Sequence, residues 1–228
     1  MIIQCRCLTK RYPADQGMVA AVNNVNFVVA QGEFVIILGH SGSGKTTLLS
    51  LIGGLTEPDS GEVLVNGVDN WHQSDEALSD MRNRTIGFVF QFASLIPTLT
   101  SLENVLLPLS FGRVPRGSHE QAREILARVG LGDKMHAYPG QLSGGQQRRI
   151  AIARAFINQP AIILADEPTG DLDEETENDI LRIFRDYNEH GTTFVVVTHN
   201  VHLARTQKNP RVLEMRQGTL LEQDGRFA

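Results

Sequence analysis

The chain has 228 residues, of which 41% are hydrophobic and 21% are charged, and its formal net charge is -5 at pH 7. We expect one domain over 1–228, since a chain of this length can bury a substantial core. The acidic balance argues against a general nucleic-acid-binding surface, so we expect no nucleic-acid partner. No apolar run approaches the roughly 20 residues that span a bilayer, and the N-terminus lacks the pattern of a signal peptide. These features predict a cytoplasmic protein.

Two strands are expected near the N-terminus, over 2–8 and 19–29, joined by a turn. Cys5 and Cys7 lie two apart in the first strand and should therefore share a face. No zinc-type spacing accompanies them, so we expect two small buried thiols and not metal ligands.

A glycine-rich turn follows, between the apolar runs 34–38 and 48–52, with the spacing of a phosphate-binding P-loop. The turn consists of Gly39, His40, Ser41, Gly42, Ser43, Gly44, Lys45, Thr46 and Thr47. Glycines allow consecutive backbone N–H groups to point at one anion, and the helix that begins near Lys45 adds the positive end of its dipole. Lys45 should reach the β- and γ-phosphates, and the Thr46 hydroxyl should bind Mg²⁺. Because both flanks fit, we interpret the turn as a nucleoside triphosphate site and not as a chance match.

The middle of the chain changes from strands to helices. The expected elements are strands at 62–67 and 86–90 and helices at 75–83, 101–111 and 119–129. Pro108 favours a kink or an early end of its helix. In the last of these helices, Ala122, Ile125, Leu126 and Val129 form one apolar stripe, which is typical of a core face.

Two further strands, at 161–165 and 193–197, are apolar throughout, which is typical of parallel strands covered on both faces. An amphipathic helix is expected between them, over 174–188, and a hairpin over 211–221.

The order of these elements predicts an α/β fold of the P-loop NTPase type, with a parallel-sheet core, an antiparallel β subdomain and an inserted helical subdomain. We place the catalytic core and the β subdomain at about 1–91 and 159–228, and the helical subdomain at about 92–158.

Two adjacent carboxylates, Asp166 and Glu167, follow the buried strand at 161–165. Ligands of open α/β sheets bind at the carboxyl ends of the strands. Asp166 should hold Mg²⁺, mostly through water, and Glu167 should accept a proton from an attacking water. Two acids at a strand end could also begin a loop or cap a helix, but the P-loop upstream favours the catalytic interpretation.

The segment 142–149 contains a second helix start suited to an anion. Ser143 should cap the helix that follows, and Gly144, Gly145 and Gln146 complete the turn. One nucleotide needs one phosphate cradle, so a second cradle in the same chain requires an explanation.

Together these motifs resemble the ATP-binding cassette (ABC) ATPases, over essentially all of 1–225. The resemblance implies ATP and Mg²⁺ as ligands, hydrolysis of ATP, and a head-to-tail homodimer. In such a dimer Ser143, Gly144, Gly145 and Gln146 of one subunit would contact the γ-phosphate held by the P-loop of the other.

Four more positions take roles from this resemblance. Gln91 matches the glutamine that lies at the Mg²⁺ ion and its water, and Asp173 matches the D-loop, which crosses between subunits. His199 matches the histidine that contacts the γ-phosphate, and Tyr12 matches the aromatic residue that stacks on adenine. Taken alone, a histidine at position 199 is more often structural, and a tyrosine near a turn is often a packed surface residue.

The departures from the family pattern are few, and they include His40 and the D-loop start Gly170-Asp171. The sequences of the D-loop, of 90–97 and of 103–105 are similar to those of ATPases that serve lipoprotein release, macrolide export, bacteriocin-type export and cell division. We therefore expect an ATPase that drives separate membrane-spanning permease subunits from the cytoplasmic face of the membrane.

Two alternatives remain open for the function. A regulatory or mechanical ATPase of a membrane complex would move no substrate. A soluble ABC ATPase acting on nucleic acid or the ribosome is less consistent with one cassette and a net charge of -5. We also expect the apolar stretch 92–97 to meet the membrane subunit, with burial under the helical region as the alternative.

Overall fold

The computed structural model describes residues 1–14, 17–111, 117–170 and 172–222. Its strands are β1 (Ile3–Ala14), β2 (Gly17–Val29), β3 (Phe34–Leu38), β4 (Ser60–Val65), β5 (Val68–Asp69), β6 (Ile86–Val89), β7 (Ile162–Asp166), β8 (Thr193–Thr198), β9 (Arg211–Arg216) and β10 (Thr219–Glu222). Its α-helices are α1 (Lys45–Ile52), α2 (Asp75–Thr85), α3 (Ser101–Leu106), α4 (Ser118–Arg128), α5 (Gly144–Phe156), α6 (Glu174–Glu189) and α7 (His202–Thr206).

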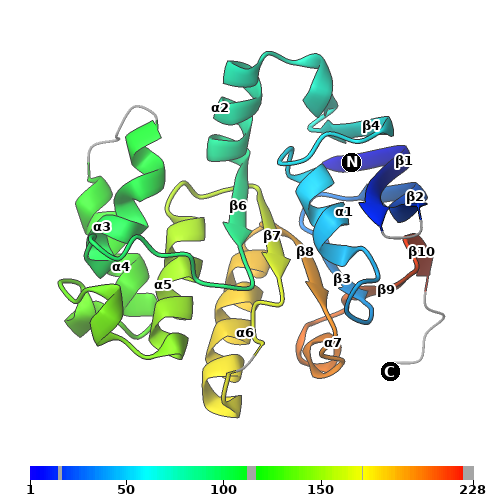
Figure 1. Ribbon diagram of the computed structural model, residues 1–228. Helices are drawn as coiled ribbons and strands as arrows, with labels where there is room; N and C mark the ends of the chain where they lie inside the picture. The colour runs from blue at the N-terminus through cyan, green and yellow to red at the C-terminus, as the bar shows by residue number, and fades with distance from the viewer. Residues whose placement is uncertain (15–16, 112–116, 171, 223–228) are drawn as a thin grey trace.

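A six-stranded sheet in the order β10-β9-β3-β8-β7-β6 forms the core (Figure 1). Strands β9, β3, β8, β7 and β6 pair in parallel, and β10 closes one edge as the antiparallel partner of β9. Every residue of β3, β7 and β8 is buried, as their continuous apolar runs predict. Because these three strands are neighbours and parallel, the segments that follow them emerge side by side at one edge of the sheet.

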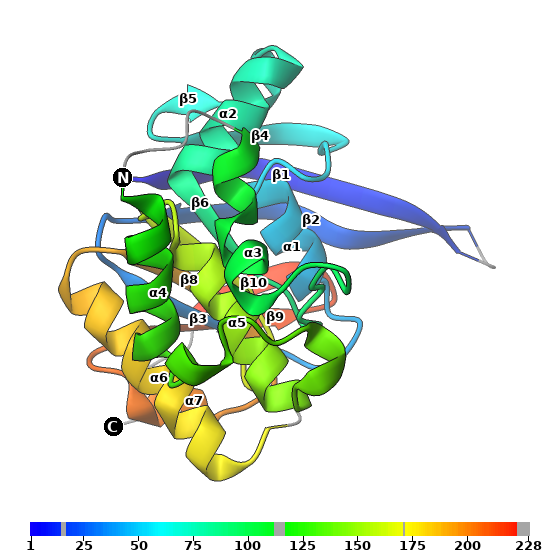
Figure 2. The same cartoon turned by 90° about the vertical axis from the view of Figure 1, so that its left-hand side faces the viewer.

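A second, antiparallel sheet has the order β2-β1-β4-β5, and α1 lies between it and the core sheet. One apolar cluster runs through both sheets and α1. Strand β1 continues to Ala14, although the sequence predicts its end near residue 8. Beyond Thr9, where the pairing of β1 with β4 ends, β1 pairs with β2 alone, so the missing N–H of Pro13 is tolerated. The resulting β1–β2 hairpin projects from the molecule (Figure 2).

The prediction that Cys5 and Cys7 share a buried face is wrong. The register between β1 and β2 shifts between Cys5 and Leu8, and Cys7 has a φ of 48°. The backbone N–H of Cys7 donates to the side-chain oxygen of Asn26 at 3.0 Å. Cys5 is therefore buried and Cys7 is exposed, because a β-bulge breaks the alternation on which the prediction depends.

Helices α3, α4 and α5 pack around a third apolar cluster beside the core sheet (Figure 1). The predicted stripe of α4 is buried, with Ala122, Ile125, Leu126 and Val129 all in this cluster. The α-helical part of the predicted 101–111 helix ends early, and a 3₁₀ turn covers Leu107–Phe111. This early end agrees with Pro108, which has no N–H for the helical ladder.

Within the described ranges, no helix has the length and apolar character needed to cross a membrane.

Candidate active site

The segment between β3 and α1 lines a cavity of about 650 Å³ at the edge of the core sheet. Gly44 caps α1 with a φ of 105°, and a Cβ at this position would collide with the backbone oxygen of Ala21. At Gly39 a Cβ would lie 2.6 Å from the backbone oxygen of Met215. The loop therefore packs directly on β2 and β9, and both positions require glycine.

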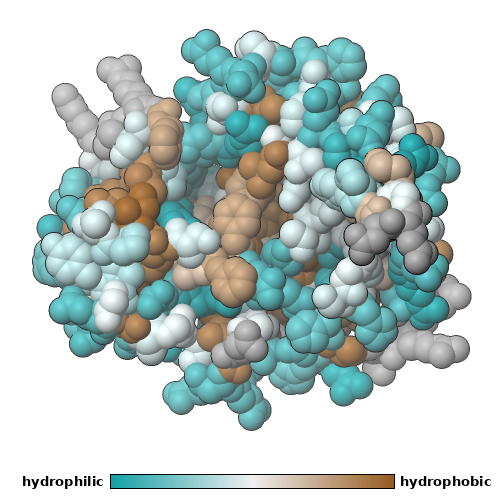
Figure 3. Space-filling view, in the orientation of Figure 1, coloured by the Kyte–Doolittle hydropathy of each residue, from teal (hydrophilic) through white to brown (hydrophobic). Residues whose placement is uncertain are grey.

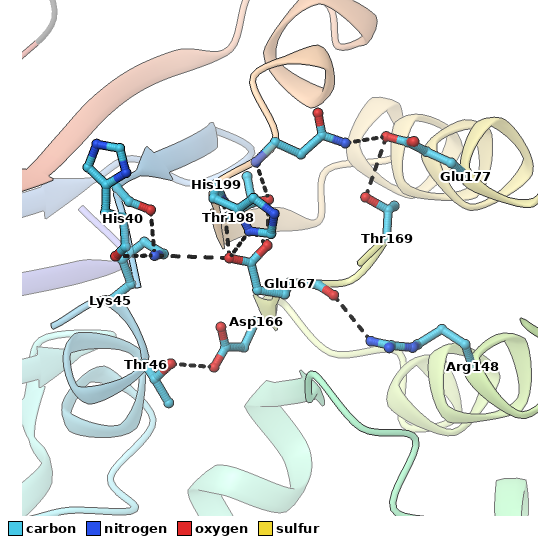
Figure 4. Close-up of polar contacts among 12 residues, drawn as sticks. His40, Lys45, Thr46, Arg148, Asp166, Glu167, Thr169, Glu177, Thr198 and His199 are labelled. Carbon is cyan, nitrogen blue, oxygen red and sulfur yellow. Dashed lines mark hydrogen bonds and ion pairs between the residues drawn. The ribbon is translucent and has the colours of Figure 1, made fainter. Parts of the chain in front are cut away.

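Lys45 is buried at the start of α1, and its ammonium group lies across the loop (Figure 4). The Nζ atom donates to the backbone oxygens of Gly39 at 2.7 Å and His40 at 3.1 Å. It lies 4.0 Å from Oε1 of Glu167. The buried hydroxyl of Ser43 has no hydrogen-bond partner within the described part of the chain. A cation and an unpartnered buried hydroxyl in one glycine-rich loop fit a phosphate group.

Thr46 and Asp166 meet across the same cavity. The Thr46 hydroxyl donates to Oδ2 of Asp166 at 2.7 Å. Burial raises the pKa of Asp166 above its ordinary value, the bond from Thr46 lowers it, and the nearby Glu167 and Lys45 charges act in opposite directions. A hydroxyl and a carboxylate so placed are the hard oxygen ligands that Mg²⁺ prefers.

The Glu167 carboxylate directly follows β7 and accepts hydrogen bonds from residues at the end of β8 (Figure 4). Its Oε2 accepts from the Thr198 hydroxyl at 2.7 Å, and its Oε1 accepts from the backbone N–H of His199 at 3.0 Å. Nδ1 of the His199 ring lies 2.9 Å from the same Oε1. Glu167 has a φ of 44°, a conformation that is uncommon outside glycine and concentrates at functional sites. The structure thus brings Lys45, Glu167 and His199 together.

Gln91 lies in the loop after β6 and lines the same cavity. Ser143 caps α5 as predicted: its hydroxyl accepts from the N–H of Gln146 at 3.2 Å, and its own N–H donates to the Gln146 side chain at 3.0 Å. The signature segment, by which we mean Ser143–Gln146, is not part of the lining of this cavity in the described chain.

Asp173 and Tyr12 also lie apart from the described lining of the cavity. Asp173 caps α6, and bonds from the backbone N–H and hydroxyl of Thr176 lower its pKa. Tyr12 is 40% exposed on the β1–β2 hairpin, and Nζ of Lys10 lies 5.8 Å from its ring centroid. Asp171 of the D-loop lies outside the described residues.

Arg148, at the site, is not among the residues that the sequence motifs predict. From α5 its Nη1 donates to the backbone oxygens of Glu167 at 3.2 Å and Phe90 at 3.3 Å. It therefore connects the helix that carries the signature segment to the ends of β6 and β7. Its position two residues after the signature segment is the one sequence signal that could have indicated it.

The chain matches the family model described as ABC transporter over residues 22–170. An uncharacterized ABC transporter ATP-binding protein of Thermotoga maritima is 51% identical over 195 residues, which cover 85% of this chain and 83% of the relative. A solved dimer of the ATP-binding cassette MJ0796 in a post-hydrolysis state, bound to ADP and Pi, has a TM-score of 0.90 and 41% identity, with 99% of each chain covered. A second dimeric structure of MJ0796, described as a bacterial ABC transporter cassette, has 42% identity and the same TM-score of 0.90. The chain belongs to the ABC transporter family and is one of its ATPase cassettes.

Proposed function

We propose that this cassette hydrolyses ATP in the cavity of about 650 Å³, with Glu167 as the general base. The observation that carries the proposal is the position of the Glu167 carboxylate, 4.0 Å from the Lys45 ammonium and 2.9 Å from the His199 ring. Thr46 and Asp166 would hold Mg²⁺. When bound, this ion would neutralise charge on the β- and γ-phosphates.

Each of the remaining groups has a role that its contacts support. The Lys45 ammonium can exchange its bonds to two backbone oxygens for phosphate oxygens. The Glu167 carboxylate accepts the proton of the attacking water. The Nδ1 atom of the His199 ring faces Glu167. The His199 side chain remains 69% exposed at the cavity, where it would contact the γ-phosphate. Gln91 lies on the opposite loop and would orient the water.

The first test is Glu167→Gln. We expect ATP binding to remain and turnover to fall by about 10²–10⁴, because the amide keeps the shape but removes the basic oxygen. The amide oxygen of the glutamine can still accept from the backbone N–H of His199. The Thr198 hydroxyl can rotate to accept from the new NH₂ group. ATP turnover, nucleotide affinity and size-exclusion chromatography should show an inactive, ATP-bound dimer. Turnover close to wild type would exclude Glu167 as the base.

We further propose that the active form is a head-to-tail homodimer in which the signature segment of one chain completes the site of the other. The chain carries two anion-binding helix starts, and the second has Ser143 and Gly144 exposed to solvent, away from the first. The solved MJ0796 cassettes are dimers. In this dimer we also expect Tyr12 to stack on the adenine ring and Asp173 to cross the interface between the subunits.

A groove of about 1070 Å³ lies between α2 and β6 on one side and the end of α3 on the other. Apolar side chains gather in this hollow (Figure 3). Phe88 and Phe90 stack at 5.5 Å along one wall, and Pro108 and Phe111 lie on the other. Phe90 is 43% exposed and Phe111 is 76% exposed. Exposed apolar side chains that gather in one hollow, as Phe90 and Phe111 do, indicate an interaction surface.

We propose that this groove receives a membrane-spanning permease subunit and holds the cassette at the cytoplasmic face of the membrane. The expected docking stretch 92–97 borders the groove: Ser94 lines it, and Phe92 and Ile96 are exposed at 75% and 37%. Burial of these two side chains under the helical layer, the alternative interpretation, does not occur.

The second test uses Phe92→Glu and Phe111→Glu. We expect each to reduce co-purification with co-expressed permease subunits while basal ATPase activity remains, since both side chains lie outside the cavity that holds Glu167. Leu221→Glu, at a residue that is 45% exposed on β10, is the matched control. Undiminished association of both Phe92→Glu and Phe111→Glu would place the docking surface elsewhere.

We assign the cassette to the subgroup that serves lipoprotein release, macrolide export and cell division, supported by the sequence at 90–97 and 103–105. We also divide the chain functionally into 1–91 with 159–228, and 92–158, supported by the separate apolar cluster of the helical layer.

A further inference from the structure

Glu177 lies in the first turn of α6, and its side chain is only 14% exposed. Its Oε1 accepts from the Asn200 amide at 2.8 Å and lies 3.5 Å from the Thr169 hydroxyl, which donates to it (Figure 4). Nδ1 of His202 lies 3.7 Å from the same oxygen. A carboxylate this little exposed loses part of its hydration, and hydrogen bonds from its partners compensate that loss.

The partners of Glu177 belong to the two segments that carry the catalytic groups. Asn200 directly follows His199, and Thr169 lies two residues after Glu167. The Asn200 N–H donates to the Thr198 hydroxyl at 2.9 Å, which itself donates to Glu167 at 2.7 Å. The chain from Glu177 to the base is therefore continuous.

We propose that Glu177 is a positioning residue for ATP hydrolysis: through Asn200 and Thr169 it fixes the distance between the Glu167 carboxylate and the His199 ring. This inference rests on the roles proposed above for Glu167 and His199. The His199 ring is 69% exposed, so its placement depends on how firmly the backbone after β8 is held.

A role in starting α6 does not account for this burial. Glu174 and Glu175 lie in the same first turn and are exposed, and they supply the negative charge that a helix N-terminus favours. Asp173 supplies the cap. Glu177 differs from these acids in that its carboxylate points to the loop after β8.

The test reverses the hydrogen bond between positions 177 and 200. Asn200→Asp places two carboxylates against each other and keeps the oxygen that accepts from the His202 N–H at 2.9 Å. We expect it to lower kcat by about tenfold with ATP affinity within about twofold of wild type. Glu177→Gln should lower kcat by only about threefold, because the amide oxygen still accepts from Asn200. When Asn200→Asp is combined with Glu177→Gln, the amide at position 177 can donate to the carboxylate at position 200, so the hydrogen bond is restored with its direction reversed. The kcat of this variant should return to within about threefold of wild type.

Glu175→Gln is the matched control, since it removes the same charge from the same helical turn at an exposed site, and its kcat should match wild type. Melting temperatures of all variants should agree within a few degrees. The inference is overturned if Asn200→Asp turns over at the wild-type rate, or if the combined variant is no faster than Asn200→Asp. It is also overturned if kcat falls together with ATP affinity and melting temperature, because Glu177 would then be structural. Normal turnover of Glu167→Gln would instead overturn the proposed function itself.

Discussion

At the scale of single residues, the surroundings of each side chain decide its chemistry. Cys5 and Cys7 are two positions apart on one strand, yet burial raises the pKa of Cys5 to about 12 while Cys7 is exposed. A buried thiol with such a pKa holds almost no thiolate, the form that reacts. The bulge in β1 is the cause, since it turns Cys7 out of the core.

This difference predicts that a thiol reagent at pH 8 modifies one cysteine per native chain rapidly and the second only on unfolding. Cys7→Ser should abolish the fast phase, and Cys5→Ser should leave it unchanged. Counting modified thiols with time in native and denaturing buffer provides the measurement. Two equal rates in the native protein would contradict the burial of Cys5.

At the scale of elements, hydrogen bonds between side chain and backbone at the helix N-termini fix where α3 and α5 begin. Helix α3 begins with a capping box in which Thr100 and Glu103 exchange bonds between side chain and backbone. The backbone N–H and the hydroxyl of Thr100 lower the pKa of Glu103 below its ordinary value. Helix α5 uses the same device with Ser143 and Gln146, so the signature segment is also a conventional helix start.

The lowered pKa of Glu103 gives the stability of the protein a pH dependence of known sign. Its contribution is fully present above the unfolded-state pKa of about 4.3 and is lost as the pH falls through the lower folded-state value. We therefore expect Glu103→Gln to lower the melting temperature at pH 7 and to have little effect near pH 2. Glu120→Gln, in the first turn of α4, is the control. A larger effect of Glu103→Gln in acid would reverse the predicted sign.

At the scale of the whole molecule, the two helix starts proposed to bind phosphate lie in different parts of the fold. The P-loop leads from β3 of the core sheet into α1, and the signature segment begins α5. Helix α5 packs in the helical layer through Ile150 and Ala153 and against the core sheet through Ile152 and Phe156. Arg148 connects the layers through the backbone oxygens of Phe90 and Glu167. The groove proposed for the permease lies along the same boundary.

The composite dimer can be tested with two inactive variants, Lys45→Ala and Ser143→Arg. The first lacks a working P-loop and keeps its signature segment, and the second has the opposite defect. A mixed dimer contains one doubly defective site and one intact site, so mixing should restore part of the turnover, measured as ATP hydrolysis against protein concentration. Full activity of Ser143→Arg alone would exclude the role of Ser143 in the partner's site.

The sequence by itself determined the elements whose signals are local. The P-loop, the acidic pair Asp166-Glu167 and the three apolar strands β3, β7 and β8 follow from spacing and continuous hydrophobicity, which report what a short segment can do alone. The fold class and the capped start of α5 follow in the same way, and the resemblance to a known family added Gln91 and His199, which line the cavity.

The tertiary structure decided which distant groups meet. The bonds of Glu167 to Thr198 and His199 span 31 and 32 residues, and that of Glu177 to Asn200 spans 23. Such contacts depend on which strands are neighbours and on how a helix is rotated over the sheet, and a pattern within one segment reports neither. The bulge at Cys7 and the length of β1 were decided similarly, because a register shift changes which side chains face the core without changing the sequence pattern around it.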